Sequence, residues 1–267
     1  MLNSINPNSL NNAQTALATS LTRLSTAQRI NSAKDDAAGL AIASAMAAQL
    51  GSSSQAMRNV GDGLSLTSTA ESALGQAGDM LQRISELSVQ AANGSNSASD
   101  RMAIQAEVSQ LQQGLGQVME TTQFNGQKLF DGSFTSQLQT GPNAGDTTTL
   151  SLPQVSPETL GVAALDVSTV AGANAAISAT DSAMSNVNGM RADIGAQQAS
   201  LNSTLANLSG TYENLAAAKS RIADTDYAQE TANLSRNTTQ QQAAMQALKL
   251  YNANQSSVLG LINPTRG

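Results

Sequence analysis

Closely spaced carboxylates are the residues of this sequence best suited to chemistry. Asp35 and Asp36 are adjacent, and Asp224 and Asp226 are separated by one residue. Adjacent helical side chains point about 100° apart, so the first pair would not converge on one substrate atom. The second pair supplies too few oxygens for Ca²⁺. We therefore expect the first pair in a solvated or salt-bridged connector and the second in a helix cap or turn.

The residue types on which most catalysis depends are missing. The chain contains no His and no Cys, which removes the usual metal ligands, the usual general base near neutral pH and the thiol nucleophile. No glycine loop of the kind that binds phosphate is present. An enzyme is therefore the weakest interpretation, and no catalytic residue, metal or cofactor is expected.

The net charge of −6 is concentrated in the middle of the chain. Residues 1–50 carry three basic and two acidic side chains, and residues 223–267 carry three of each. Residues 51–222 carry the remaining seven basic and fourteen acidic side chains, a net of −7. Because no basic patch exists to neutralise phosphates, no nucleic-acid partner is expected.

Neither a membrane span nor a leader is recognisable. No run approaches the roughly 18 apolar residues that a spanning helix needs, so no membrane insertion is expected. No basic segment followed by an apolar stretch opens the chain, as it does in a secretory signal peptide. These criteria alone predict a cytoplasmic protein.

Five prolines delimit two long arms. They are Pro7, Pro142, Pro153, Pro157 and Pro264, so residues 8–141 and 158–263 contain none. Because proline costs about 3 kcal/mol or more in a helix interior, this pattern predicts a mainly α protein. We expect a long antiparallel helical hairpin, or coiled-coil rod, with a small β-hairpin insert. The small aliphatic side chains that dominate the composition suit close helix packing.

Periodicity and turn signals refine this expectation. Ten of the fourteen positions that step by four and three from Ile177 to Ile222 are apolar, counting Tyr212, which favours a coiled coil. In the first arm, 93–96 reads as a break, and Ser97 with Asp100 predicts a capping box that opens the next helix. That helix is expected to end near the turn signal at 124–126. Residues 147–152 read as a strand of the hairpin.

Both ends of the chain carry interrupted apolar stripes, which are the candidate subunit-assembly residues. They are Leu10, Leu17, Leu21, Leu24, Leu234, Met245, Leu248, Leu259 and Ile262. Polar residues such as Gln14 and Gln241 interrupt the stripes at seam positions. The ends are too polar for a stable isolated hairpin and too apolar for a solvated tail. We expect them to be disordered alone and to fold when a partner covers them.

Several blocks, in order along both arms, resemble those of bacterial flagellins. They are LTRLS at 21–25, RINSAKDDAAG at 29–39, QRISELSVQ at 82–90, TQFNG at 122–126, LFDG at 129–132, SRIADTDYA at 220–228 and LSR at 234–236. Ala27 departs from the family, which usually has Gly there. The large variable outer domains are missing, so the chain is similar to a short form.

The resemblance implies a structural subunit that polymerises into the bacterial flagellar filament used for motility. Residues 1–33 and 223–267 would pair as the inner core of the filament, and 34–132 with 171–222 would form the coiled-coil rod. Residues 133–170 would be a short variable insert. The implied location is extracellular, reached by type III export without a cleaved leader. The implied partners are further copies of the chain, an export chaperone and the export apparatus, and hook-associated and cap proteins.

The resemblance also singles out a surface patch made of Gln82, Arg83, Leu87 and Glu107. In flagellins the matching positions are where the innate immune flagellin receptor of animals binds. Contacts along the filament are the other interpretation of this helix face, and both remain open.

Two alternative functions remain. A hook–filament junction protein resembles flagellin at both ends but would not polymerise alone. A secreted coiled-coil effector or pore-forming translocator would need a strongly apolar segment, which is missing from this sequence.

Overall fold

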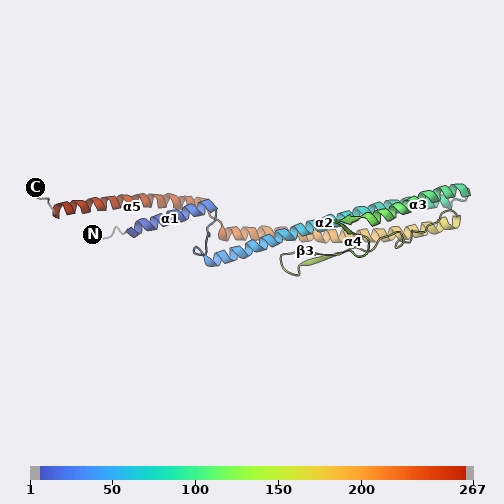
Figure 1. Ribbon diagram of the computed structural model, residues 1–267, viewed down its shortest axis with the longest axis horizontal. Helices are drawn as coiled ribbons and strands as arrows, with labels where there is room; N and C mark the ends of the chain where they lie inside the picture. The colour runs from blue at the N-terminus through green and yellow to red at the C-terminus, as the bar shows by residue number, and fades with distance from the viewer. Residues whose placement is uncertain (1–6, 263–267) are drawn as a thin grey trace. The chain divides into compact units, whose positions relative to one another are not determined.

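The chain is mainly α-helical, as the proline and apolar patterns predict. A computed structural model describes the backbone of residues 7–262 and the surroundings of side chains from 10 to 258. Within these residues the helices are α1 (Pro7–Thr26), α2 (Ala37–Ala92), α3 (Ala98–Thr121), α4 (Val170–Ala223) and α5 (Tyr227–Ile262) (Figure 1). The strands are β1 (Gln123–Phe124), β2 (Gln127–Lys128), β3 (Thr135–Gln139) and β4 (Thr147–Ser151).

The chain divides into two compact units. One comprises Met1–Leu50 with Glu213–Gly267, and the other comprises Gly51–Tyr212. Both boundaries fall inside long helices, α2 and α4, rather than in loops.

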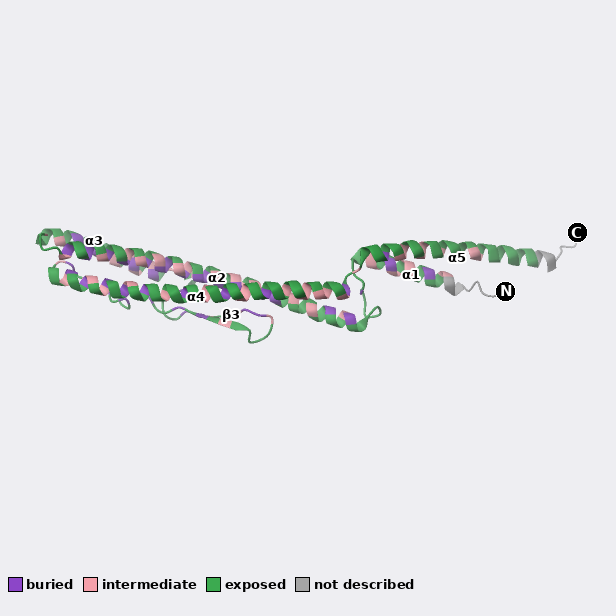
Figure 2. Ribbon diagram, turned by 180° about the vertical axis from the view of Figure 1, so that it is seen from behind, coloured by how far each residue is buried: buried purple, intermediate pink, exposed green. Residues whose placement is uncertain are grey.

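In the Gly51–Tyr212 unit, α2 and α4 run antiparallel around a shared apolar core. An ion pair of 2.9 Å joins Arg191 Nη2 on α4 to Glu71 Oε1 on α2. Every seventh residue of α4 is buried, at Thr180, Val187, Ile194, Leu201 and Leu208. In Figure 2, buried stretches (purple) recur along α4. The heptad repeat read from the sequence is therefore confirmed.

The α4 seam expected from the sequence consists of two rows of residues, each with a spacing of seven, and only the row that contains Ile194 is fully buried. Met184 and Leu205, from the other row, are half-buried, and Arg191 is exposed. The second buried row begins instead at Ala176 and Ala183. Small alanine side chains allow the helices to approach closely there, which leaves the larger residues at the edge of the contact.

Local capping signals define the α2–α3 connection and the end of α3. Ser97 Oγ accepts a hydrogen bond from Asp100 N, and Asp100 Oδ2 accepts one from Ser97 N, which confirms the capping box. After α3, Asn125 and Gly126 have φ of 50° and 80° between β1 and β2. Positive φ at both central residues is what a tight two-residue hairpin turn requires, so the predicted turn is also confirmed.

The predicted β-hairpin insert is present and shares the core of the helices. β3 pairs antiparallel with β4, in a register that runs from Thr135 opposite Ser151 to Gln139 opposite Thr147. Leu150 packs in the same apolar cluster as Leu74 of α2. The insert therefore needs no core of its own.

The segment that leads from the hairpin to α4 is held on α3 by two glutamines. Gln105 Nε2 donates to Leu165 O at 3.1 Å, and its Oε1 accepts from Val167 N at 2.6 Å. Gln112 Nε2 donates to Val162 O at 2.6 Å. Each amide thus satisfies backbone groups that would otherwise lack partners.

In the part of the chain that the structure describes, none of the helices combines the length and apolar character of a membrane span.

Candidate assembly surface of the terminal helices

The terminal helices α1 and α5 pair with each other (Figure 1). Pro7 begins α1, where its missing N–H and fixed φ do no harm. Asp226 caps α5, because its Oδ1 accepts hydrogen bonds from Ala228 N at 2.9 Å and Gln229 N at 3.1 Å. The expectation of a cap or turn at the second carboxylate pair is therefore confirmed.

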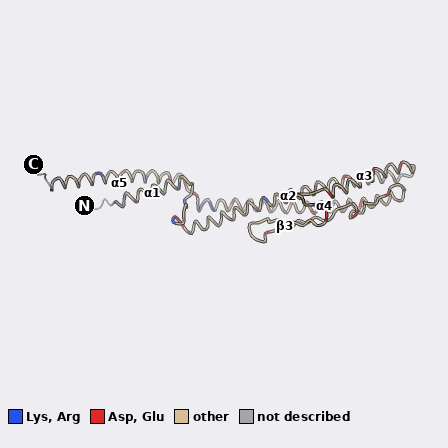
Figure 3. The backbone as a smooth tube through the Cα atoms, viewed as in Figure 1, with Lys and Arg blue, Asp and Glu red and all other residues tan. Residues whose placement is uncertain are grey.

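The seam between α1 and α5 is only weakly apolar. Among the α1 residues whose side chains the structure describes, only Ala13 and Ser20 are buried. The expected assembly residues Leu10, Leu17, Leu24, Leu234 and Leu248 are half-buried in this seam. Charged side chains are sparse along both helices (Figure 3), so few ion pairs are available to hold the pair together.

Two expected assembly residues point to solvent, and two cannot be placed. Leu21 is 52% exposed and Met245 is 42% exposed. Leu259 and Ile262 lie outside the residues whose side chains are described. The apolar stripes therefore split between residues that face the partner helix of the same chain and residues left uncovered by it.

The structure adds exposed apolar residues of α5 that the stripe analysis missed. Leu250 is 66% exposed, and Tyr251 and Val258 are also exposed. Every side chain from 251 to 258 faces solvent. Tyr251 and Val258 follow Glu230, Asn237 and Ala244 at intervals of seven residues, and Leu250 lies off that row. The stripe that starts at Leu234 includes neither this row nor Leu250. An exposed stretch of this kind, with large apolar side chains, marks an interaction surface.

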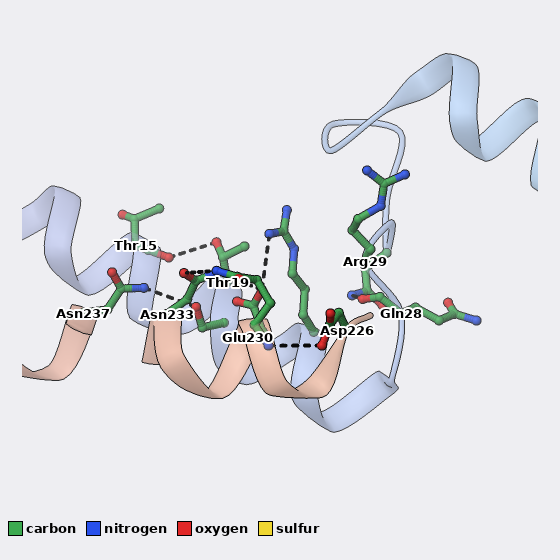
Figure 4. Close-up of polar contacts among 12 residues, drawn as sticks. Thr15, Thr19, Gln28, Arg29, Asp226, Glu230, Asn233 and Asn237 are labelled. Carbon is green, nitrogen blue, oxygen red and sulfur yellow. Dashed lines mark hydrogen bonds and ion pairs between the residues drawn. The ribbon is translucent and has the colours of Figure 1, made fainter. Parts of the chain in front are cut away.

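Next to the apolar contacts lies a polar layer made of Ser20, Arg23, Glu230 and Asn237. Figure 4 shows Glu230 and Asn237 of this layer. The side chain of Glu230 is only 8% exposed and lies 3.9 Å from the Arg23 guanidinium. Asn237 Nδ2 donates to Ser20 Oγ at 3.2 Å. This layer was also missed, because polar residues at seam positions were interpreted only as interruptions.

At the start of the pair, two connecting segments meet in a clasp, which we define as residues 27–29 and 222–225. Arg29 N donates to Ala223 O at 2.7 Å, and Thr225 N donates to Ala27 O at 3.0 Å. The Arg29 guanidinium donates through Nη2 to Ile222 O at 2.6 Å. An arginine at the C-terminal end of α4 satisfies a free carbonyl and complements the helix dipole.

Ala27 occupies the left-handed region of the backbone, with φ of 59°. An L-residue pays a steric cost there that glycine avoids. The departure from glycine noted in the sequence thus falls at a position where glycine has a physical advantage.

In the carboxylate pair at 35 and 36, Asp35 closes a turn of the connector and Asp36 caps α2. Asp35 Oδ2 accepts from Ser32 Oγ and Ser32 N at 3.0 Å each and from Asn31 N at 3.2 Å. These hydrogen bonds, led by that of the Ser32 side chain, lower the pKa of Asp35. Asp36 Oδ1 accepts from Gly39 N at 2.8 Å, at the start of α2. Both residues lie in an exposed connector, as expected, and face different donors.

No metal centre accompanies these carboxylates. Among the residues that the structure describes, no three or more His, Cys, Asp or Glu side chains gather closely enough to hold a metal ion.

Three of the four residues of the α2–α3 patch lie at the surface. Arg83 Nη2 lies 2.8 Å from Glu107 Oε1, and Arg83 Nη1 lies 3.2 Å from Glu86 Oε2. Hydrogen bonds to Glu107, and then to Glu86, raise the pKa of Arg83. Arg83, Glu107 and Gln82 are exposed. Leu87 corrects the expectation, because it is 2% exposed and packs in an apolar cluster beneath the surface.

Sequence comparison assigns this architecture to a family. The bacterial flagellin N-terminal helical region matches residues 1–135, and the bacterial flagellin C-terminal helical region matches residues 177–262. The chain therefore belongs to the bacterial flagellin family. Flagellins are structural proteins rather than enzymes, and this sequence contains neither His nor Cys.

Individual relatives agree with this assignment. B-type flagellin of Pseudomonas aeruginosa is 50% identical over 153 residues, which are 57% of this chain and 31% of that protein. A flagellin of Salmonella muenchen is 46% identical over 166 residues, which are 62% of this chain and 33% of that protein. The chain thus spans about a third of the length of these relatives.

Solved structures share the fold. The crystal structure of Bacillus cereus flagellin is 31% identical, with a TM-score of 0.52, and the match covers 61% of this chain and 94% of that one. A putative flagellar hook-associated protein from Vibrio parahaemolyticus has a TM-score of 0.63 at 16% identity, covering 71% of this chain and all of that one. At that identity the second likeness concerns the fold alone.

Proposed function

We propose that the chain is a structural subunit that polymerises into the bacterial flagellar filament used for motility, and that α1 and α5 drive the polymerisation. The observation that carries the proposal is the uncovered part of α5. All side chains from 251 to 258 are exposed there, Tyr251 and Val258 among them, and Leu250 precedes them. In a member of the flagellin family, further copies of the same chain are the natural occupants of this surface.

Energetics explain why assembly and ordering of the ends would be coupled. Fixing the backbone of one residue costs about 1–2 kcal/mol, while buried apolar surface returns about 25 cal/mol per Å². Among the described residues, the α1–α5 seam fully buries only Ala13, Ser20 and Glu230 and covers parts of leucine side chains, so it offsets only part of this cost. Contacts with neighbouring copies supply the rest, and head-to-tail contacts that do not close into a ring produce a helical filament.

The domain roles follow from the resemblance and belong to the same proposal. Residues 1–33 and 223–267 form the inner core of the filament, 34–132 and 171–222 form the coiled-coil part, and 133–170 are the short insert. The pairing of α1 with α5 supports the first assignment, and the shared core of α2 and α4 supports the second.

The location and the remaining partners are proposed on the resemblance alone. The subunit leaves the cell by type III export, with an export chaperone that covers its apolar end, and joins an extracellular filament bounded by hook-associated and cap proteins. The exposed Arg83–Glu107 pair is proposed as a contact along the filament and as a contact of the innate immune flagellin receptor. If the Arg83→Ala monomer activated the receptor as well as the parent monomer does, the proposed receptor contact would be wrong.

Fibre growth in precipitating salt, followed by negative-stain microscopy, tests the main proposal. Leu250→Gln combined with Val258→Gln is expected to abolish fibres while the helix content stays that of the parent. Val170→Gln is the matched control, because Val170 is an exposed valine outside the terminal helices, and it should form fibres like the parent.

Deletion provides a second test. Chains lacking 1–30 or 235–267 should remain soluble and helical but form no fibres. Fibres from either deleted chain, or from the double glutamine variant, would contradict the role given to α1 and α5.

A further inference from the structure

We propose that the clasp, residues 27–29 with 222–225, sets the register in which α1 pairs with α5. The inference concerns the terminal helices of a single chain, and it holds or fails independently of polymerisation. It rests on a contrast between a repetitive seam and a clasp that can form in only one alignment.

The apolar part of the seam repeats along both helices. Leu10, Leu17 and Leu24 are half-buried at intervals of seven residues, which correspond to two helical turns and about 10 Å. A slip of that length places one leucine where another lies now. On α5, Leu234 and Leu248 lie two such intervals apart with Gln241 midway between them, and all three are half-buried. Burial of apolar surface therefore distinguishes poorly between the observed register and a slipped one.

The clasp, in contrast, joins specific residues at fixed distances from both helices. Its two backbone hydrogen bonds, from Arg29 N to Ala223 O and from Thr225 N to Ala27 O, form an isolated antiparallel bridge. α1 ends at Thr26, directly before the clasp, and α5 begins at Tyr227, directly after it. The connections are too short to absorb seven residues, so a slip must break both hydrogen bonds or unwind a helix.

Specific side-chain contacts between α1 and α5 gather near the clasp. Tyr227 Oη donates to Leu24 O at 3.0 Å, and the polar layer follows within the last two turns of α1. A slip of seven residues would separate Arg23 from Glu230 and leave a buried carboxylate without its cation, which is unfavourable. Between residues 10–19 and the described part of α5, the structure shows no hydrogen bond. The information that selects one register therefore lies at the clasp end.

Disulfide reporters can read the register directly, because the native chain contains no cysteine. Ser20 contacts Asn237, and two turns further along each helix bring Ala13 opposite Ala244. Ala13→Cys with Ala244→Cys is therefore the native-register reporter. Ala13→Cys with Tyr251→Cys reports a slip of seven residues. Both pairs are placed in the full-length chain, oxidised mildly at low concentration and mapped by mass spectrometry.

In the parent, the native reporter should form its intramolecular disulfide at least about tenfold faster than the slip reporter, since the two Cα atoms must come within about 7 Å. Arg29→Ala with Thr225→Pro removes the guanidinium and one backbone donor of the clasp. In that background the ratio of the two rates should fall at least about threefold, because the leucine part of the seam is repetitive and only the polar layer still favours the observed register.

Two control variants separate the clasp from general effects of substitution. Thr225→Ala keeps the backbone N–H that donates to Ala27, and Arg236→Ala removes an exposed cation from α5. Both should retain the rate ratio of the parent.

Three results would overturn the proposal. Equal rates for both reporters in the parent would mean that no single register is selected. A parent-like ratio in the clasp variant would mean that the register is set elsewhere. Loss of both disulfides in the clasp variant would mean that the clasp holds the helices together without aligning them.

Discussion

Replacing Ala27 by glycine tests whether the clasp is strained. In the left-handed region, an L side chain costs about 1–2 kcal/mol. Glycine avoids that cost but gives the unfolded chain more freedom, which costs about 0.4–1 kcal/mol. The Ala27 methyl is exposed, so its removal sacrifices no burial. Ala27→Gly should therefore stabilise the clasp by about 0.5–1 kcal/mol.

Native-state hydrogen exchange provides the assay, because two amides report on the clasp alone. Arg29 N–H donates to Ala223 O, and Thr225 N–H donates to Ala27 O. A gain of 0.5–1 kcal/mol corresponds to about a two- to fivefold slower exchange at both amides, since 1.36 kcal/mol is a factor of ten. Ala18→Gly is the matched control, because Ala18 is exposed inside α1 and glycine there costs about 1 kcal/mol.

Ala27→Gly and Ala18→Gly make the same chemical change, but the first should slow local amide exchange and the second should accelerate it. If Ala27→Gly instead accelerated exchange at Arg29 and Thr225, as Ala18→Gly is expected to do for α1, the strain argument would be refuted. The left-handed conformation of Ala27 would then not be the one that the protein adopts in solution.

Three further predictions concern the Gly51–Tyr212 unit, each with its own measurement. A Cβ at Gly172 would meet a backbone carbonyl oxygen, whereas nothing lies near Gly189. In thermal unfolding, Gly172→Ala should therefore destabilise the protein by about 1–3 kcal/mol, and Gly189→Ala should stabilise it by up to about 1 kcal/mol. Equal effects would contradict the close approach of the carbonyl oxygen to Gly172. Leu201 is fully buried and Leu205 is half-buried. In urea titrations, Leu201→Ala should lower the free energy of unfolding by about 2–5 kcal/mol, and Leu205→Ala should lower it clearly less. The reverse order would contradict the assignment of Leu201 to the buried row of α4. Hydrogen bonds from Ser97 lower the pKa of Asp100 in the folded protein. The contribution of the Asp100 carboxylate to stability is therefore present above the pKa of the unfolded chain, about 3.9. It is lost as the pH falls through the lower pKa of the folded protein. Below about pH 4, the protection of amides at the start of α3, relative to their intrinsic exchange rates, should therefore fall in the parent and change less in Asp100→Asn. Identical pH profiles of protection would show that the cap does not depend on this charge.

Features encoded by neighbouring residues could be predicted from the sequence. The capping box at Ser97 and Asp100, and the tight turn at Asn125 and Gly126, depend on contacts within a few residues. The buried row of α4 could also be predicted, because a heptad repeat fixes which residues share one face of a helix. Family resemblance then supplied the assignment to flagellin, which composition alone did not.

Features that depend on distant residues could not be predicted. Arg29 and Ile222 meet in the clasp, although 193 positions separate them, and neither residue type signals the other. The burial of Leu87 depends on how α2 packs against α3 and the segment leading to α4, so it was placed on the surface in error. The second row of the α4 seam shifted for a similar reason, since alanines permit a closer approach than the pattern of large apolar residues suggests.

The candidate assembly surface falls between these cases. The leucine stripes of both ends follow from their spacing, and Leu10, Leu17 and Leu24 do lie in the α1–α5 seam. Leu250 does not follow the repeat, and Val258 follows the row of Asn237 rather than that of Leu234, so only the structure identifies both as exposed. The polar layer had a signal in the sequence, namely a charged residue at a seam position, but its partner on the other helix could not be named.

Hydrogen exchange of residues 251–258, compared between dilute monomer and fibres grown from the same protein, tests the central claim most directly. Assembly through α5 predicts fast exchange of these amides in the monomer and strong protection in the fibre, where neighbouring copies cover Tyr251 and Val258. Equal exchange in both states, or strong protection already in the monomer, would contradict the claim that copies of the chain cover this surface.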